Sequence, residues 1–259
     1  MKKTFFLFMF FTNLMVFSQA PKAFEDGEWL KFRIHYGWFN ASFATLEVKE
    51  ENFRGHPVYH VIGHGESTGL LDLFFEVDDT YESYINKETG LPMRFIRKIN
   101  EGGYEKNNMI DFDQANNKAV VTNRIKNTAE IFTIKNKVQD MLSAFYFLRN
   151  EIQGKQFQKG DEIVTNMFFD NENYKFVSKF LGRETINTEF GKIACLKFRP
   201  FVQAGRVFKE KESLTFWISA DKNHIPIKIK AELAVGSLEA DLAAFKGLKH
   251  PFEIIVEQN

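Results

Sequence analysis

Most of this chain alternates apolar and polar residues with a period of two, and this pattern limits the fold to a mostly β structure. Successive side chains of a strand point to opposite faces, so alternation marks strands with one buried face. Leu30, Phe32, Ile34 and Tyr36 share one face of the first such segment, and Lys31, Arg33 and His35 share the other. Further strands are expected over Ala44 to Val48, Val58 to Gly63, Tyr81 to Ile85, Met93 to Ile99, Met109 to Phe112, Ala119 to Thr122, Glu162 to Phe169, Tyr174 to Leu181, Glu184 to Glu189, Ile193 to Phe198, Ser213 to Ile218, Ile225 to Ala231, Ser237 to Phe245 and Phe252 to Val256.

One segment departs from this period and predicts a helix. Its apolar residues recur at intervals of three and four, which places them on one helical stripe: Val138, Met141, Leu142, Phe145 and Leu148. We expect the helix over Val138 to Asn150, with Asn136 or Asp140 as its N-cap. A short second helix is expected over Leu70 to Phe75. The predicted fold is mostly β, a curved antiparallel sheet (a half-barrel or open barrel) wrapped around one central helix.

The N-terminus predicts export. Lys2 and Lys3 precede an apolar stretch that ends at small residues, the pattern of a secretory signal peptide. The stretch is too short and too interrupted for a membrane anchor, the alternative reading. We expect cleavage after Ser18, a signal peptide over residues 1–18 and one β-rich domain over residues 19–259. The periplasm is the expected location of the soluble product, with secretion into the medium as the alternative.

The composition excludes several classes of partner. Without Lys2 and Lys3, 32 basic and 34 acidic residues remain, so the chain has no electrostatic reason to bind nucleic acid.

Cys195 is the sole cysteine, which excludes an intrachain disulfide, and its apolar neighbours predict a buried inert thiol. No cofactor motif is present. The 30 phenylalanines indicate either a Phe-packed core or an apolar groove for an acyl chain.

Several short motifs, in this order, resemble one known family. They are Gly27-Glu28 with Leu30 to Gly37, Asp79 to Ile85 with Thr89 to Pro92, Asp140 to Arg149, Gly182 to Glu184, Phe190 to Lys192, Cys195, Pro200, Phe216 to Ser219, Asp221 and Pro226. Together they are similar to the exported domain-of-unknown-function family 3108. The resemblance implies an export signal, a mostly antiparallel β fold and a distant likeness to the half-barrels of periplasmic lipoprotein carriers. It implies no established activity and no functional residues.

The sharpest enzymatic candidate is Ser67, which lies in a G-x-S-x-G pattern, Gly65 to Gly69. A nucleophile elbow of this kind needs a parallel sheet with crossover helices, and the alternation predicts neither. His224 or His250 would have to supply the base. We therefore expect no catalytic activity.

Metal binding is not expected either. His56, His60 and His64 are four residues apart, which on a strand separates neighbours by about 13 Å. Ligands of one zinc ion lie about 2 Å from it, so a straight strand cannot join two of these histidines. His35 and His224 are isolated in the sequence, and the acidic cluster around Asp79 lacks calcium-loop spacing.

The sequence thus predicts a non-catalytic exported protein that binds an apolar envelope molecule such as a lipid or acyl chain. The expected ligand groove comprises Met141, Leu142, Phe145, Leu148 and Trp217. The alternative is a structural or interaction module with an envelope protein as partner, and a serine hydrolase using Ser67 is the third hypothesis.

Overall fold

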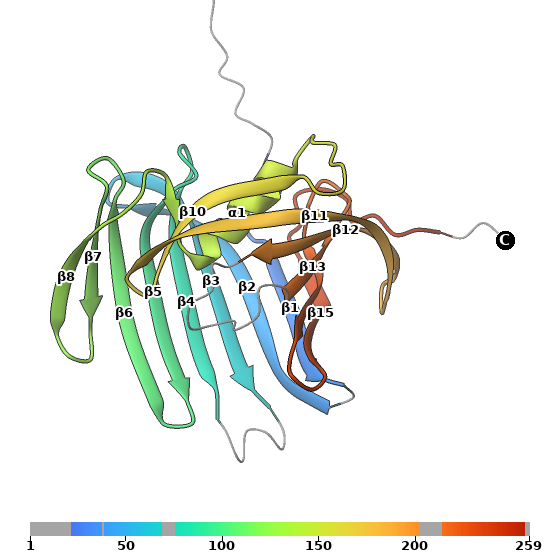
Figure 1. Ribbon diagram of the computed structural model, residues 1–259, viewed down its shortest axis with the longest axis horizontal. Helices are drawn as coiled ribbons and strands as arrows, with labels where there is room; N and C mark the ends of the chain where they lie inside the picture. Colours follow the sequence, from blue (N-terminus) through green and yellow to red (C-terminus); the bar gives the residue numbers. More distant parts are fainter. Residues whose placement is uncertain (1–21, 38, 69–75, 202–213, 257–259) are drawn as a thin grey trace, which may run out of the picture.

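The computed structural model describes residues 22–37, 39–68, 76–201 and 214–256, which form one 15-stranded sheet and one helix (Figure 1). The strands are β1 (Trp29–Tyr36), β2 (Phe39–Phe53), β3 (His56–Ser67), β4 (Asp78–Asn86), β5 (Pro92–Glu101), β6 (Tyr104–Asp113), β7 (Lys118–Asn123), β8 (Thr128–Thr133), β9 (Val138–Gln139), β10 (Glu162–Phe169), β11 (Glu172–Thr188), β12 (Gly191–Phe201), β13 (Leu214–Ser219), β14 (Pro226–Glu232) and β15 (Ser237–Lys246). The helix is α1 (Met141–Ile152). The expected signal peptide and the expected short helix over Leu70 to Phe75 lie outside the described residues.

The sheet is open, and its order places the first strand, β1, beside the last strand, β15. The order runs from β8 through β7, β6, β5, β4, β3, β2 and β1 to β15, and then through β14, β13, β12, β11 and β10 to β9. Every neighbouring pair is antiparallel except β9 and β10, which are parallel. The prediction of a mostly β chain with an antiparallel sheet is confirmed, and the parallel pair at one edge corrects it.

The helix begins three residues later than expected. Asp140 is its N-cap: the Asp140 carboxylate accepts from the Ser143 amide at 2.8 Å, and the Ser143 hydroxyl accepts from the Asp140 amide at 2.8 Å. This reciprocal capping box confirms Asp140 as the N-cap, so the helix begins at the next residue, Met141. Val138 instead belongs to β9, where it pairs with Asn166. Within the described ranges, no helix has the length and apolarity needed to cross a bilayer.

The helix packs against strands from both halves of the sheet. On one side, Leu142 and Tyr146 join a core built from β2 to β7, β9 and β10. Gly63 of β3 lies beneath Leu142: a Cβ at Gly63 would make an ordinary contact with Leu142 at 3.6 Å and a tight one with Leu46 at 3.3 Å. On the other side, Leu148 and Ile152 join a second core built from β10 to β13. Side chains of both cores therefore fix the helix in place.

A long hairpin reaches beyond its neighbours and shapes the candidate site. β11 and β12 stay paired as far as Thr188 and Gly191, whereas β12 pairs with β13 only from Cys195 to Phe198. At the turn end of this hairpin, Phe190 packs against β15 and the segment after it. Its ring centroid lies 5.2 Å from that of Phe245 and 6.1 Å from that of Phe252. The strand expected over Phe252 to Val256 is wrong: this segment makes one isolated bridge, between Ile255 and Lys192.

Candidate functional site

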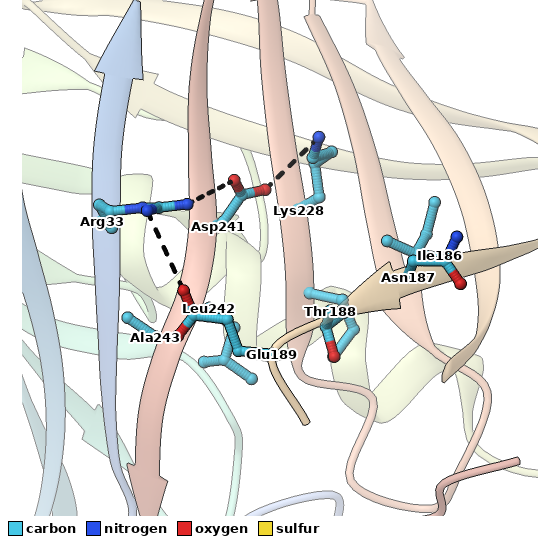
Figure 2. A pocket seen from close by; sticks show the side chains of 10 residues that line it. Arg33, Ile186, Asn187, Thr188, Glu189, Lys228, Asp241, Leu242 and Ala243 are labelled. Atoms are coloured by element: carbon cyan, nitrogen blue, oxygen red, sulfur yellow. Dashed lines mark ion pairs between the residues drawn. The ribbon is translucent and has the colours of Figure 1, made fainter. Parts of the chain in front are cut away.

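Three neighbouring strands place a row of charged side chains on one face of the sheet. Asp241 of β15 lies directly opposite Arg33 of β1 on one side and Lys228 of β14 on the other. Arg33 Nη2 is 3.8 Å from Asp241 Oδ2, and Lys228 Nζ is 3.5 Å from Asp241 Oδ1. Figure 2 shows both cations pointing toward this carboxylate from opposite sides. The Asp241 carboxylate is thus shared between two cationic side chains.

A second charged row lies two residues further along the same strands. Glu239 of β15 is opposite His35 of β1 and Lys230 of β14. Since side chains two residues apart share a face, the two rows form one patch. His35 Nε2 reaches diagonally to Asp241 Oδ2 at 2.7 Å, and Lys228 Nζ reaches Glu239 Oε2 at 2.7 Å.

Burial and pairing oppose each other at Lys228 and Glu239. Partial burial disfavours both charges. The hydrogen bond between the two side chains and the attraction of further opposite charges, Asp241 for Lys228 and Lys230 for Glu239, together outweigh this effect, so the pKa of Lys228 is raised and the pKa of Glu239 is lowered. Both side chains therefore keep their charge at neutral pH.

A hollow of about 320 Å³ lies beside Asp241, between this patch and the free end of the β11–β12 hairpin (Figure 2). It has apolar and polar walls. The lining residues are Arg33, Ile186, Asn187, Thr188, Glu189, Ile227, Lys228, Asp241, Leu242 and Ala243. Ligand pockets typically measure about 300–1,000 Å³, so this hollow suits a small molecule.

The five residues of the predicted groove do not share one cluster. Leu142 and Phe145 belong to the core beside β2 to β7, and Leu148 belongs to the core beside β10 to β13. Trp217 belongs to a third core, and its indole Nε1 donates to Glu184 at 3.0 Å. Met141 is 36% exposed. A separate hollow of about 50 Å³ borders another face of the helix, at Ser143 and Tyr146, so the groove stays a prediction.

Ser67 lies at the end of β3 in a setting unlike a nucleophile elbow. β3 pairs antiparallel with both β2 and β4, whereas the elbow needs a parallel sheet. The Ser67 hydroxyl accepts from the Val77 amide at 2.8 Å. His224 lies in the turn after β13, where burial lowers its pKa.

The structure places three of the histidines on one strand and brings a fourth, His35, into the charged patch. His56, His60 and His64 lie on β3, as predicted, and His60 is held between Glu51 and Glu82 of the two adjacent strands. His35 is isolated in the sequence, but the fold brings its ring to Asp241, 206 residues further along the chain.

Sequence reasoning missed the charged patch as a whole. The only signal available was charge at every second position: Arg33 with His35, Lys228 with Lys230, and Glu239 with Asp241. This spacing shows that the members of each pair share a face. Which strands are neighbours cannot be read from it.

The fold defines the class of protein: an open, barrel-like, mostly antiparallel β domain with one helix in its described part. The chain belongs to the family DUF3108, proteins of unknown function, whose sequence profile matches residues 31–243. This confirms the resemblance noted in the sequence.

Several solved structures are similar to this chain, including two that cover most of its length. One is the β-barrel-like protein of domain of unknown function DUF1849 from Brucella abortus, with a TM-score of 0.59 and 10% identity over 87% of this chain and 99% of that one. The other is a "putative lipoprotein" from Parabacteroides distasonis ATCC 8503, with a TM-score of 0.35 and 13% identity over 88% of this chain and 100% of that one. No curated protein matches. At such identities the first likeness supports the barrel-like fold alone.

Proposed function

We propose that this protein is a non-catalytic exported protein that binds a small amphiphilic molecule of the cell envelope. The two halves of the sheet enclose α1 as a half-barrel and provide a rigid frame for the hollow beside Asp241. One observation carries the proposal: a single hollow of about 320 Å³ is lined by both apolar and charged residues.

The lining suits a ligand with an apolar body and an anionic head. The apolar lining comprises Ile186 and Ala243, which are partly exposed, and Ile227 and Leu242, which are almost fully buried. Arg33 and Lys228 are both ion-paired with Asp241, Arg33 also pairs with Glu189 at 4.0 Å, and a guanidinium has five N–H donors. A carboxylate or phosphate entering the hollow can therefore recruit a donor without breaking the existing pair.

Calorimetric titration with decanoate, a small fatty acid, tests this proposal. Ala243→Trp should weaken binding at least about tenfold, which corresponds to about 1.4 kcal/mol, because the indole fills the hollow. Ala244→Trp is the matched control, because Ala244 is the next residue of β15 and does not line the hollow. Equal affinities in both variants would overturn the assignment of the hollow.

The groove predicted along the helix is a competing location for the same ligand. Met141 is the most exposed of the helical residues predicted to line this groove, and Met141→Glu places a charge there. If decanoate binds this groove, Met141→Glu abolishes binding and Ala243→Trp does not. The opposite pattern is expected from the hollow.

Absence of catalysis is part of the proposal. The antiparallel pairing of β3 on both sides of Ser67 supports it, since a nucleophile elbow needs a parallel sheet. A fluorophosphonate probe should leave the purified protein unlabelled. Labelling that is lost in Ser67→Ala would establish the hydrolase alternative instead.

Export to the periplasm is supported by the basic head and apolar stretch of the N-terminus. Cell fractionation should recover the protein from the periplasm, with Gln19 as its first residue. A protein recovered with Met1 intact from the cytoplasm would contradict this.

An interaction module is the second candidate function, favoured by an exposed apolar hairpin end. Between β14 and β15, Leu233 is 51% and Val235 77% exposed, and Tyr36 of β1 packs beside them, its hydroxyl donating to the Val235 carbonyl. Exposed apolar clusters mark contact sites more often than scattered single residues do. A photo-crosslinker at Val235 should capture an envelope protein in exporting cells, and one at Ile131, 72% exposed on β8, should not.

A further inference from the structure

We propose that His35, Glu239 and Asp241 form a binding site for a divalent transition-metal ion at the rim of the hollow. One ligand atom from each residue can be chosen so that all three lie within 4.8 Å of one another. The backbone explains this convergence. His35 lies directly opposite Glu239, and Asp241 follows two residues later on the same face of β15. The site goes beyond the proposed amphiphile binding and does not depend on it.

His35 is oriented as a metal ligand should be. Its Nδ1 lies 2.7 Å from the Gly37 carbonyl oxygen. Because a carbonyl oxygen can only accept, Nδ1 donates to Gly37, and a hydrogen on Nε2 bridges to the Asp241 carboxylate at 2.7 Å. Metal-ligating histidines are held by this same kind of bond from the second ring nitrogen. A metal ion replaces the hydrogen between Nε2 and the carboxylate with only a small outward movement of the two side chains, since ligand atoms on a shared ion are about 3 Å apart.

The donor set indicates the class of ion. One imidazole nitrogen and two carboxylate oxygens suit ions such as Zn²⁺, Fe²⁺ and Mn²⁺. Three protein ligands leave coordination positions open to water or to a ligand in the hollow, because Asp241 also lines it.

Lys228 already supplies a positive charge at this place. Its ammonium lies 2.7 Å from Glu239 and 3.5 Å from Asp241, between the two carboxylates. A metal ion must displace it, and the long lysine stem permits this movement. Arg33, 3.8 Å from Asp241, and Lys230, 3.7 Å from Glu239, remain nearby and weaken the attraction of a second cation. The site therefore exchanges an internal cation for a metal ion, with affinity limited by that competition.

This competition gives the proposal a directional test. Isothermal titration of the mature protein with ZnCl₂ should show saturable one-to-one binding. Lys228→Met should bind Zn²⁺ about tenfold more tightly, because the stem remains and the competing charge is gone. His35→Gln should bind it at least about tenfold more weakly, because a ligand is lost and even the loss of a residue that only supports a ligand typically costs about 10–100-fold.

His56→Gln is the matched control, because His56 is exposed at the start of β3 and away from the cluster. Its affinity should equal that of the wild type. The proposal is overturned if the wild type shows no saturable binding, if His35→Gln binds as tightly as the wild type, or if Lys228→Met gains nothing.

Discussion

The guanidinium of Arg149 and the carboxylate of Glu28 form a two-contact ion pair in which both side chains are completely buried. Nη1 lies 2.6 Å from Oε1 and Nη2 lies 2.7 Å from Oε2. Nε and Nη2 also donate to the Asn223 carbonyl oxygen. Burial disfavours the charge of Arg149, yet Glu28 outweighs it and the pKa of Arg149 is raised. The pair thereby ties α1 to the segment before β1 and to the turn after β13.

Breaking this pair should be strongly destabilising. Arg149→Met leaves the Glu28 carboxylate buried without its partner, which typically costs about 3–5 kcal/mol. Urea unfolding measures the loss. The double variant Glu28→Gln with Arg149→Met removes both charges and should be more stable than the sum of the single losses implies. Strict additivity of the two single losses would contradict the coupling.

Lys155→Met is the control for this measurement. Lys155 pairs with Glu151 at 2.6 Å on an exposed part of the helix end. Solvent screening reduces such pairs to about 0–1 kcal/mol, so this variant should be near neutral.

His60 should make stability depend on pH near neutrality. Burial lowers its pKa, but hydrogen bonds to Glu82 and Glu51 outweigh burial and raise it. A group with a raised pKa in the folded state stabilises the protein fully below its unfolded pKa, about 6.5, and loses this contribution as the pH rises through the folded pKa. His60→Gln should therefore lose most stability at about pH 5.5 and least above about pH 8. A loss that grows with pH would contradict the ion pairing.

Asp140 should produce a slope of the same sign in a lower window. Complete burial raises its pKa to about 6, although hydrogen bonds from Ser143 and Ser83 oppose the rise. Between about pH 4 and pH 6 the folded protein holds a proton that the unfolded chain has lost, so stability falls as the pH rises. Asp140→Asn should abolish this slope. If the slope persists in that variant, another group causes it.

Asp140→Ala separates the cap from the charge. Asparagine still accepts from the Ser143 amide, whereas alanine leaves that amide and the buried Ser83 hydroxyl without the carboxylate that each contacts. At neutral pH, Asp140→Ala should lose at least about 1 kcal/mol more than Asp140→Asn, as measured by urea unfolding.

The local parts of this architecture could be predicted from the sequence. Alternation located most of the strands, although not β8 or β9, and a three- and four-residue repeat located the helix, with Asp140 as one of the two expected caps. Val138 misled the prediction because it continued the apolar stripe. Asp140 has an extended backbone, with φ −88° and ψ −176°, so the chain before it cannot be helical and pairs as β9 instead.

The site could not be predicted because its residues meet only through the order of the strands. His35 and Asp241 are 206 residues apart, and Arg149 and Glu28 are 121 apart. Periodicity states which face a side chain occupies but not which strand lies beside it. The hollow depends in addition on how far the β11–β12 hairpin extends past β13, which turn residues alone do not reveal.

Gly247 should tolerate no side chain, because it lies against the backbone of Gly27. A Cβ at Gly247 would clash with the carbonyl group of Gly27, lying 2.6 Å from its carbon, and the φ of Gly247 is +66°. Gly154 has nearly the same φ, +68°, with no atom within 4 Å of its Cβ position. Gly154→Ala should therefore cost only the backbone strain, about 1–2 kcal/mol.

Gly247→Ala should cost about 2 kcal/mol more than Gly154→Ala in urea unfolding, since the clash is with backbone and cannot be relieved by a side-chain rotation. The Gly27 amide donates to the Val48 carbonyl at 3.0 Å, so displacement of Gly27 should also weaken this bond to β2. Hydrogen exchange at Gly27 should accelerate in Gly247→Ala and not in Gly154→Ala. Equal costs and unchanged exchange would show that the segments before β1 and after β15 do not pack against each other, because only the close approach of Gly247 to Gly27 distinguishes the two variants.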